Sequence, residues 1–273
     1  MRATPERLNT ATLTVILPHY DCADYLSLAV ESVLRQDFRD LVLVVVDDCS
    51  PDDAWTRALR PFAADTRLVA LRTSRNVGHL RIKNAVLERV RGPYVGFQDA
   101  DDISLPGRFT HQVRMLASGR ADLVGCGYQY IDDAGRITGH RRMPRHGNLW
   151  MRLGRSTVAH HPATVIRRDM MDRLRGFDGT VRLGADTDFH LRASRLYRLR
   201  NTRRLLYQYR IWPKSLTQAP DTGFGSEARR AYTEAMTARE LTRRQARSRE
   251  ELLPLLAAPP NDIEFELRPV RIG

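Results

Sequence analysis

Short runs of apolar residues alternate with stretches of helical periodicity along the first hundred residues of this 273-residue chain. The runs are continuous, a pattern typical of strands that are covered on both faces. Four are expected to be strands: TLTVIL (12–17), LVLVVV (41–46), RLVAL (67–71) and YVGF (94–97). Strands that alternate with helices predict an α/β fold, a mainly parallel sheet with helices on both faces.

Between these runs, apolar residues recur at helical spacing. The three sets are Leu26, Val30, Val33 and Leu34; Trp55, Leu59 and Phe62; and Ile82, Val86 and Val90. The second helix has a start signal, because Ser50 is a favoured N-cap, Pro51 suits the first helical position and Asp53 completes a capping box.

Beyond residue 105 the pattern is less regular. We expect a helix over PGRFTHQVRMLASG (106–119), a strand over DLVGCGYQYI (122–131) and a hairpin turn at DDAGR (132–136). The basic stretch 136–160 shows little periodicity, so we expect a flexible loop over the ligand-binding edge.

The last part of the chain is rich in arginine. Residues 189–199 are expected to be helical, and residues 226–256 to form a charged helix of weak amphipathicity. Pro259 and Pro260 then interrupt the chain before IEFELRPV (263–270), whose alternation predicts a terminal strand.

Polar residues follow each of the four predicted strands. They are Pro18 to Tyr20, Asp47 and Asp48, Asn76, and Asp99 to Asp102. Ligands of parallel sheets bind beyond the carboxyl ends of the strands, so we expect these residues to share one rim. No GxGxxG or GxxxxGK[ST] follows these strands, so neither a dinucleotide fold nor a P-loop is indicated.

The stretch FQDADD (97–102) places three carboxylates within four residues, directly after a predicted buried strand. Like charges this close raise one another's pKa and repel. The cluster is therefore costly unless a cation lies among the carboxylates or they have separate roles.

The formal charge of the chain is +12, from 44 basic and 32 acidic residues, and only Lys83 and Lys214 are lysine. This balance suggests anionic ligands without proving them, since a solvated basic surface would give the same count. RLYRLRNTRR (195–204) is the strongest local exception to that surface interpretation. The length of 273 residues predicts one large core, or one core with a smaller lobe, and the hydrophobic content of 42% is that of an ordinary globular protein.

The cysteines Cys22, Cys49 and Cys126 form no CxxC pair, which fits a reducing compartment best. The N-terminus lacks the apolar segment of a signal peptide, and no window approaches the ~20 apolar residues of a membrane helix. We therefore expect a soluble, cytoplasmic protein, with peripheral membrane contact left open.

Several separated motifs, taken together and in order, resemble glycosyltransferase family 2, the inverting nucleotide-sugar transferases of the GT-A fold. They are VILPHYDCADYLSLAVESVLRQD, VVVDDCSPDD, NVGHLRIKN, VGFQDADD, GFDG followed by GADTDFHLR, and YRIWPKSLT. The resemblance implies a GT-A domain (1–217) with a Rossmann-like nucleotide-sugar-binding half (12–104) and an acceptor-binding half (105–217). A helical extension with a terminal strand (218–273) follows.

The resemblance assigns roles to the carboxylates of FQDADD. Asp99 would hydrogen-bond the ribose of the donor. Asp101 would coordinate Mg²⁺ or Mn²⁺ together with the diphosphate, whose negative charge grows as it leaves the sugar. For Asp102 the simpler role is to cap the following turn.

Asp47 suits the N3–H of uracil or thymine, or the N1–H of guanine, because a carboxylate only accepts hydrogen bonds; it would reject cytosine. The resemblance favours uridine. Tyr20, after Pro18, is placed to contact the base, with ordinary packing as the alternative. Asp48 is expected to support the loop ahead of Ser50.

Other candidates come from the third motif, NVGHLRIKN, and from the acceptor side. Lys83, with Arg81, is expected to face the nucleotide unless it is simply solvated. Asn84 is expected to tie strand ends together. His161, next to His160, is a candidate acceptor contact, with a packed or solvated histidine as the alternative.

An inverting transfer needs a base that takes the proton of the acceptor hydroxyl. The family's base is the second member of a Glu-Asp pair, which aligns with Asp186, while Ala185 replaces the glutamate. Asp188 is the weaker alternative, and either aspartate could instead be the N-cap of the helix near Phe189. A second departure is Trp212, where many relatives have a histidine that can bind metal, since indole cannot.

The prediction is thus metal-dependent, inverting transfer of a sugar from a nucleotide-sugar, preferably a UDP-sugar, to a hydroxyl of an unidentified acceptor. Ala185 and Trp212 leave open a non-catalytic nucleotide- or carbohydrate-binding protein on the same scaffold. A sugar nucleotidyltransferase would need a glycine-rich basic loop where this chain has PHYDCAD. A nucleic-acid binder is suggested by charge alone and lacks aromatic residues interleaved with basic ones on a strand platform.

Overall fold

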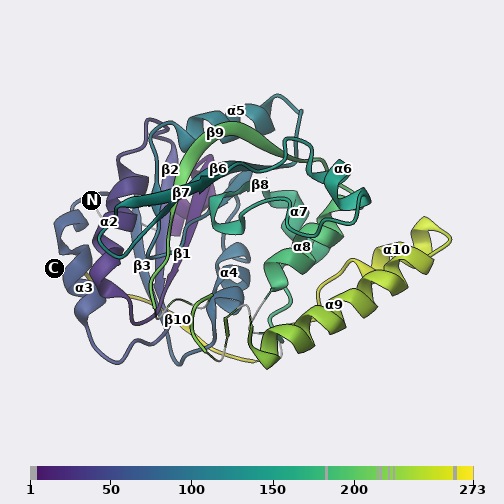
Figure 1. Ribbon diagram of the computed structural model, residues 1–273. Coiled ribbons are helices and arrows are strands. Elements are labelled where there is room, and N and C mark those ends of the chain that lie inside the picture. The colour runs from purple at the N-terminus through teal and green to yellow at the C-terminus, as the bar shows by residue number, and fades with distance from the viewer. Residues whose placement is uncertain are drawn as a thin grey trace.

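The computed structural model describes residues 5–181, 184–213, 215, 217–220, 222–223, 225–260 and 263–272. Lys214 and Leu216 of the YRIWPKSLT motif lie outside the described residues, as do residues 1–4 of the predicted domain. Within the described part, ten strands form one sheet in the order β10-β3-β2-β1-β4-β8-β6-β9-β5, with β7 paired to β6 (Figure 1).

The four strands predicted from the apolar runs are present and pair in parallel. They are β1 (Leu13–His19), β2 (Leu41–Asp47), β3 (Leu68–Thr73) and β4 (Tyr94–Phe97). In their register His19 lies opposite Asp47, and Ile16 lies opposite Phe97. The residues that follow β2 and β4 therefore lie on either side of the end of β1.

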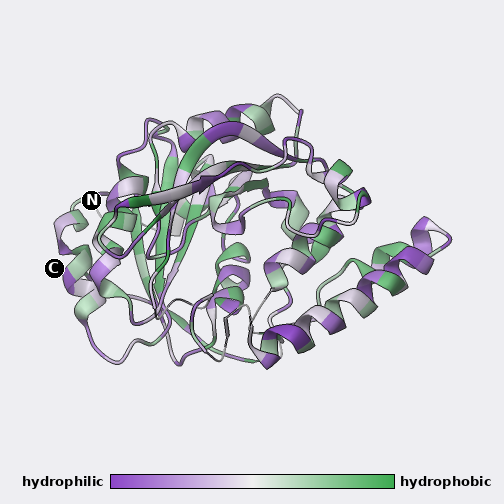
Figure 2. Ribbon diagram, in the orientation of Figure 1, coloured by the Kyte–Doolittle hydropathy of each residue, from purple (hydrophilic) through white to green (hydrophobic). Residues whose placement is uncertain are grey.

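Alternate residues of these strands point into two separate cores, one on each face of the sheet. One face is covered by α2 (Ala23–Leu34), α3 (Ala54–Leu59) and α5 (Arg108–Ala117). The other is covered by α4 (His79–Leu87), α7 (Arg168–Leu174) and α8 (Ala185–Ser194). Figure 2 shows the hydrophobic colour concentrated in the central strands between these layers. The predicted α/β architecture is confirmed.

Beyond β4 the sheet is of mixed direction. Its strands are β5 (Ile103–Ser104), β6 (Leu123–Ile131), β7 (Ile137–Arg141), β8 (Val165–Arg167) and β9 (Leu199–Arg210). The predicted strand at 122–131 and the hairpin turn after it are confirmed. The helix expected over 189–199 ends at Ser194, and the polar-looking segment after it is β9, which pairs in parallel with β6.

The stretch 136–160 is not the loop that its weak periodicity predicted. It contains β7 and α6 (Gly147–Arg152), and its backbone is tied to β9. The Asn201 side-chain amide donates to the carbonyls of Pro144 (2.7 Å) and Val158 (2.8 Å). These long-range hydrogen bonds have no signature in the local sequence.

The predicted start of α3 is wrong. The helix begins at Ala54 with Asp53 as N-cap and no side-chain capping bond. The Ser50 hydroxyl instead donates to the buried Asp47 carboxylate. The same oxygen accepts from the Asp21 backbone N–H (3.1 Å), so it is used by the rim and not by the end of the helix.

The C-terminal part contains two helices where one was expected, α9 (Glu227–Gln245) and α10 (Arg249–Leu255). Ser226 and Ser248 cap them by accepting from the backbone N–H of Arg229 and Glu251. The predicted terminal strand is confirmed as β10 (Leu267–Pro269), antiparallel to β3. The remaining elements are α1 (Pro5–Thr10), η1 (Arg60–Phe62) and η2 (His161–Ala163). Among the described helices, none has the length and apolar character needed to span a bilayer.

Candidate active site

The end of β2 presents a carboxylate that the protein holds from several sides. Asp47 is fully buried and is bonded by His19 Nδ1 (3.0 Å) and by the Ser50 backbone N–H (3.0 Å), with Arg72 Nε 3.3 Å away. Burial raises the pKa of Asp47, but the hydrogen bonds from His19 and Ser50 outweigh it and lower the pKa overall. Asp47 is therefore an oriented, ionised carboxylate that is buried beneath the rim.

Asp48 stabilises a neighbouring turn. Its carboxylate accepts hydrogen bonds from the backbone N–H groups of Val77 (2.8 Å) and Gly78 (2.7 Å). Gly78 has a φ of +86°, a conformation that favours glycine. Asp48 is thus structural, but it supports the entry to α4 rather than the loop ahead of Ser50.

Pro18 and Tyr20 lie where β1 ends. Pro18 is half-buried, and the Tyr20 side chain is 49% exposed. The exposure of Tyr20 argues against packing as its main role and leaves its ring accessible from the rim.

The carboxylate loop, residues 99–102, follows β4 directly. Asp99 and Asp101 are half-buried and Asp102 is buried, and burial is the largest cause that raises the pKa of all three. The pKa of Asp99 rises to about 6, since Asp101 and Asp186 add to burial while Lys83 opposes it. The loop therefore stores unfavourable negative charge, as the sequence predicted.

Arg108, on α5, fixes the base of this loop. It is fully buried and donates to the carbonyls of Phe97 (2.7 Å) and Pro162 (2.8 Å) and to Ser104 Oγ (2.7 Å). The sequence analysis missed Arg108, because an arginine near the start of a helix normally lies in solvent.

Asp102 connects the loop to β9. Its Oδ1 accepts from the backbone N–H of Arg210 (2.8 Å), so its role is not to cap the following turn. The Arg210 guanidinium in turn donates to the carbonyl of Asp101 (2.9 Å) and stacks on the Tyr25 ring, 4.5 Å from its centroid.

Trp212 contacts the expected metal ligand directly. Its indole Nε1–H donates to Asp101 Oδ2 (2.6 Å), and its ring packs edge-on against Tyr25. Where the resemblance expects a histidine that can bind the metal, this chain has a hydrogen-bond donor to the carboxylate itself. One oxygen of Asp101 is thereby occupied.

Lys83 lies buried beneath the loop, so it is not a solvated helical lysine. Its Nζ lies 5.5 Å from the centroid of Phe97 and 6.0 Å from that of Phe177. Burial lowers the pKa of Lys83, and the charges of Asp99 and Asp186 oppose that shift. Its cation thus lies in the field of two of the predicted site residues.

Asn84, one residue further, joins helix to loop rather than strand to strand. Its side chain bonds both the N–H (2.9 Å) and the carbonyl (2.8 Å) of Phe177. This pins α4 to the segment that leads into α8.

Asp186 lies half-buried in the first turn of α8, whose N-cap is Gly184 rather than an aspartate. One turn later His190 is buried, which lowers its pKa to about 4 although Asp186 opposes the shift. His190 Nε2 lies 3.4 Å from Nδ1 of His161, which is buried and packs on the Phe97 ring. His161 is therefore packed among aromatic rings, which is the alternative to a direct acceptor contact.

Asp188 lies on the same helix in a different environment. Its buried carboxylate is bonded by Arg192 Nε (2.7 Å) and by Arg243 of α9 (2.8 Å). With both oxygens taken by guanidinium groups, Asp188 is not available as a base.

Among the described residues, no group of three or more His, Cys, Asp or Glu side chains is arranged to hold a metal ion. Half-buried Asp101 is a hard oxygen ligand of the kind that Mg²⁺ uses when phosphates complete its shell. The residues present therefore fit a cation that arrives with a diphosphate, not one held by the protein alone.

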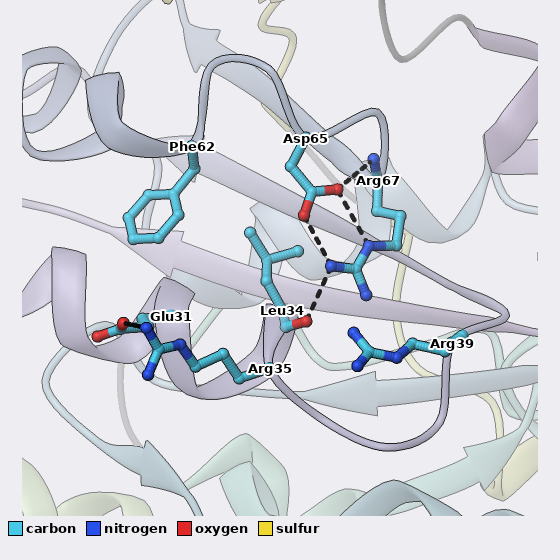
Figure 3. Close-up of a pocket in the computed structure, with 7 residues that line it drawn as sticks. All are labelled: Glu31, Leu34, Arg35, Arg39, Phe62, Asp65 and Arg67. Atoms are coloured by element: carbon cyan, nitrogen blue, oxygen red, sulfur yellow. Dashed lines mark hydrogen bonds and ion pairs between the residues drawn. The ribbon is translucent and has the colours of Figure 1, made fainter.

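Two hollows of the structure lie away from this rim. One, of about 400 Å³, is shown in Figure 3; it is lined by Glu31, Leu34, Arg35, Arg39, Phe62, Asp65 and Arg67. The other, of about 490 Å³, lies between α8, α9 and α10.

Comparison with known proteins gives consistent matches. Residues 14–175 match the model of Glycosyl transferase family 2. The chain is 26% identical over 219 residues to the uncharacterized glycosyltransferase EpsJ of Bacillus subtilis (strain 168), covering 76% of this chain and 63% of EpsJ. The chain thus spans less than two thirds of that relative's length.

Two solved glycosyltransferases share the fold. S. aureus TarS 1–349 in complex with UDP-GlcNAc has a TM-score of 0.69 at 19% identity, covering 90% of this chain and 70% of that one. Mannosyltransferase PcManGT from Pyrobaculum calidifontis, in complex with GDP-Man and Mn²⁺, has a TM-score of 0.59 at 19% identity, covering 93% and 70%. The expected GT-A fold is confirmed.

The two aspartates of α8 should differ in stability effect. Asp188→Ala is expected to lower the free energy of unfolding by roughly 3 to 5 kcal/mol, because Arg192 and Arg243 would stay buried without a counter-charge. Asp186→Ala, the matched control on the same helix, should cost less than about 1 kcal/mol. Urea unfolding of both variants measures this, and equal losses would contradict the assignment.

Asp99 should make stability depend on pH. The pKa of Asp99 is about 6 in the folded protein and near 3.8 in the unfolded chain. As the pH rises from 3.8 to 6, the unfolded chain loses this proton first, so the free energy of unfolding falls over that range. Asp99→Asn removes the cost, so it should stabilise the protein at pH 7.5 by roughly 1 to 3 kcal/mol and hardly at all near pH 4. Glu234→Gln, on the exposed side of α9, is the control; a gain equal at both pH values would refute the assignment.

Proposed function

The chain belongs to glycosyl transferase family 2, and from that premise we propose that it transfers a sugar, with inversion, from a nucleotide-sugar to a hydroxyl of an acceptor. One observation carries the proposal: the carboxylate of Asp47 at the end of β2 and the carboxylate loop that follows β4 flank the end of β1, at one rim of the sheet. In this proposal residues 12–104 supply the nucleotide site and residues 105–217 the acceptor side, while the extension 218–273 supports α8.

The nucleoside would bind beside β1 and β2. Asp47, held ionised by His19 and Ser50, would accept the N3–H of uracil, with Tyr20 and Pro18 along the base. Asp99 would accept a ribose hydroxyl. A UDP-sugar is the preferred donor; TarS was solved with UDP-GlcNAc and PcManGT with GDP-Man, and both bases carry the N–H that a carboxylate needs.

Asp101 would hold Mg²⁺ or Mn²⁺ together with the diphosphate. When bound, the cation would neutralise the charge that develops on the leaving diphosphate. Lys83 would add a fixed positive charge from below, where burial among Phe97 and Phe177 strengthens its field.

Asp186 would act as the base. As the acceptor oxygen forms its bond to the anomeric carbon, the bond from that carbon to the diphosphate breaks, and the hydroxyl proton passes to Asp186. His190 and His161, buried and neutral behind it, would form the wall on the acceptor side.

A screen of nucleotide-sugars with saccharide acceptors, read by mass spectrometry, tests the function. We expect nucleoside diphosphate and a glycosylated product from UDP-sugars and none from CDP-sugars. Asp186→Asn should lower transfer by about 10² to 10⁴ while UDP affinity stays unchanged, because only the base is lost.

Donor binding without any transfer would instead support the non-catalytic alternative. Wild-type transfer by Asp186→Asn would remove Asp186 as the base without touching the donor assignment. Calorimetry with UDP and Mn²⁺ separates these two outcomes.

Trp212 should weaken metal binding. Trp212→Phe keeps an aromatic ring against Tyr25 but removes the N–H that occupies Asp101 Oδ2. The freed oxygen should raise the affinity for Mn²⁺ in the presence of UDP by about 10- to 150-fold, which corresponds to the roughly 1.5 to 3 kcal/mol of one charge-assisted hydrogen bond. Calorimetric titration with Mn²⁺ measures it, with Trp150→Phe as the control. An unchanged or lower affinity in Trp212→Phe would show that the indole does not compete.

A further inference from the structure

Two long stretches of the chain contain no acidic residue, 134–168 and 189–220, and together they hold fifteen arginines. Of these fifteen arginines, the candidate active site described above uses only the buried Arg192 and Arg210. The stretches are far apart in sequence but lie side by side in the fold.

β9 joins the two stretches. Residues 199–201 of β9 are bonded to residues 144–158 through the Asn201 backbone N–H to the Arg145 carbonyl (3.2 Å) and through the bridge between His146 and Arg200. The Asn148 side chain also accepts from the Leu199 N–H (2.8 Å). In Figure 1 α6 accordingly lies beside the beginning of β9.

This arrangement gathers unpaired positive charge. Eight arginines form what we call the arginine face: Arg141, Arg142, Arg145, Arg152, Arg155, Arg200, Arg203 and Arg204. Within the described residues, none of the eight forms an ion pair with a carboxylate, whereas Arg195 and Arg198 beside them pair with Glu240 and Asp122. Figure 2 shows the hydrophilic colour over this part of β9.

Three large apolar side chains are exposed within the first of these stretches, on α6 and directly after it. Leu149, Trp150 and Leu153 are 54%, 41% and 68% exposed, while Met151 on the other side of the helix is buried. Residues three and four apart share a helix surface, so the three side chains form one apolar tip. The Arg155 guanidinium lies 5.7 Å from the centroid of the Trp150 ring.

We propose that the arginine face docks this protein onto an anionic lipid surface, with the apolar tip of α6 inserted among the head groups. Arginine attracts anionic lipids, and tryptophan and leucine are the side chains that partition into the bilayer interface. The exposed leucines favour lipid over nucleic acid, which would use the arginines and a stacking ring but gain nothing from Leu149 and Leu153.

Docking in this orientation would leave the rim open. β9 runs from the arginine face at Arg204 to the carboxylate loop at Arg210, a distance of about 20 Å at about 3.3 Å per residue. A lipid-anchored acceptor could thus reach the rim while the protein stays bound. The docking itself is independent of the proposed catalysis.

Sedimentation of the full chain with phosphatidylcholine vesicles, with and without about a third phosphatidylglycerol, tests the proposal. We expect binding to the anionic vesicles only, loss of binding in high salt, and a blue shift of tryptophan emission that Trp150→Phe abolishes. Arg142→Gln with Arg145→Gln should weaken binding about 25-fold, at about fivefold per arginine.

Matched variants distinguish an effect of the arginine face on vesicle binding from an effect of overall charge. Arg57→Gln with Arg60→Gln, both exposed on the α3 side, remove the same charge and should leave binding nearly unchanged. Leu149→Ser with Leu153→Ser should weaken binding, while Leu28→Ser with Leu241→Ser, on other exposed faces, should not.

Three outcomes would overturn the proposal. One is equal weakening by the test and control pairs, and another is absence of binding to anionic vesicles. The third is a dimer, seen by sedimentation, that buries Leu149 and Leu153. Salt-sensitive binding of a single-stranded oligonucleotide that needs Arg142 and Arg145, without vesicle binding, would assign the face to nucleic acid instead.

Discussion

The concentration of negative charge in the carboxylate loop is the constraint on which the rest of the structure depends. Three carboxylates follow β4 at the point where the chain leaves the core, and burial raises the pKa of each. The fold compensates with buried cations that are delivered by different elements: Lys83 from α4, Arg108 from α5 and Arg210 from β9. A site that must hold a diphosphate benefits from this arrangement, because the positive charges are already oriented before the ligand arrives.

The C-terminal extension acts on the same site from the other side. The family match ends at residue 175, yet α8, which carries Asp186, is held by residues beyond it. Tyr232 of α9 donates to the Gly184 carbonyl (2.8 Å), and Arg243 completes the charge around Asp188. The aspartate two residues from the proposed base is thus a structural ion pair, which leaves Asp186 as the accessible carboxylate of that helix.

Two departures from the family pattern have different physical consequences. Ala185 is buried and removes one negative charge from a region that is already rich in carboxylates. Trp212 changes the first contact of Asp101, because an indole N–H donates to the oxygen that a cation would use. Both departures make the site less negative toward a cation, and the diphosphate would have to supply more of the metal's ligands.

The sequence by itself determined the parallel half of the sheet, its covering helices and the rim, because continuous apolar runs and helical spacing are local properties of the chain. It also identified the carboxylates of FQDADD, since their clustering needs an explanation whatever the fold. Only the tertiary structure decided the features that depend on contacts between residues far apart in the sequence. β9 is a strand because β6 pairs with it, Ser50 bonds Asp47 rather than capping α3, and Asp188 is neutralised by an arginine 55 residues away. Each of these outcomes depends on which groups meet across the fold, and no pattern within a short window of sequence contains that information.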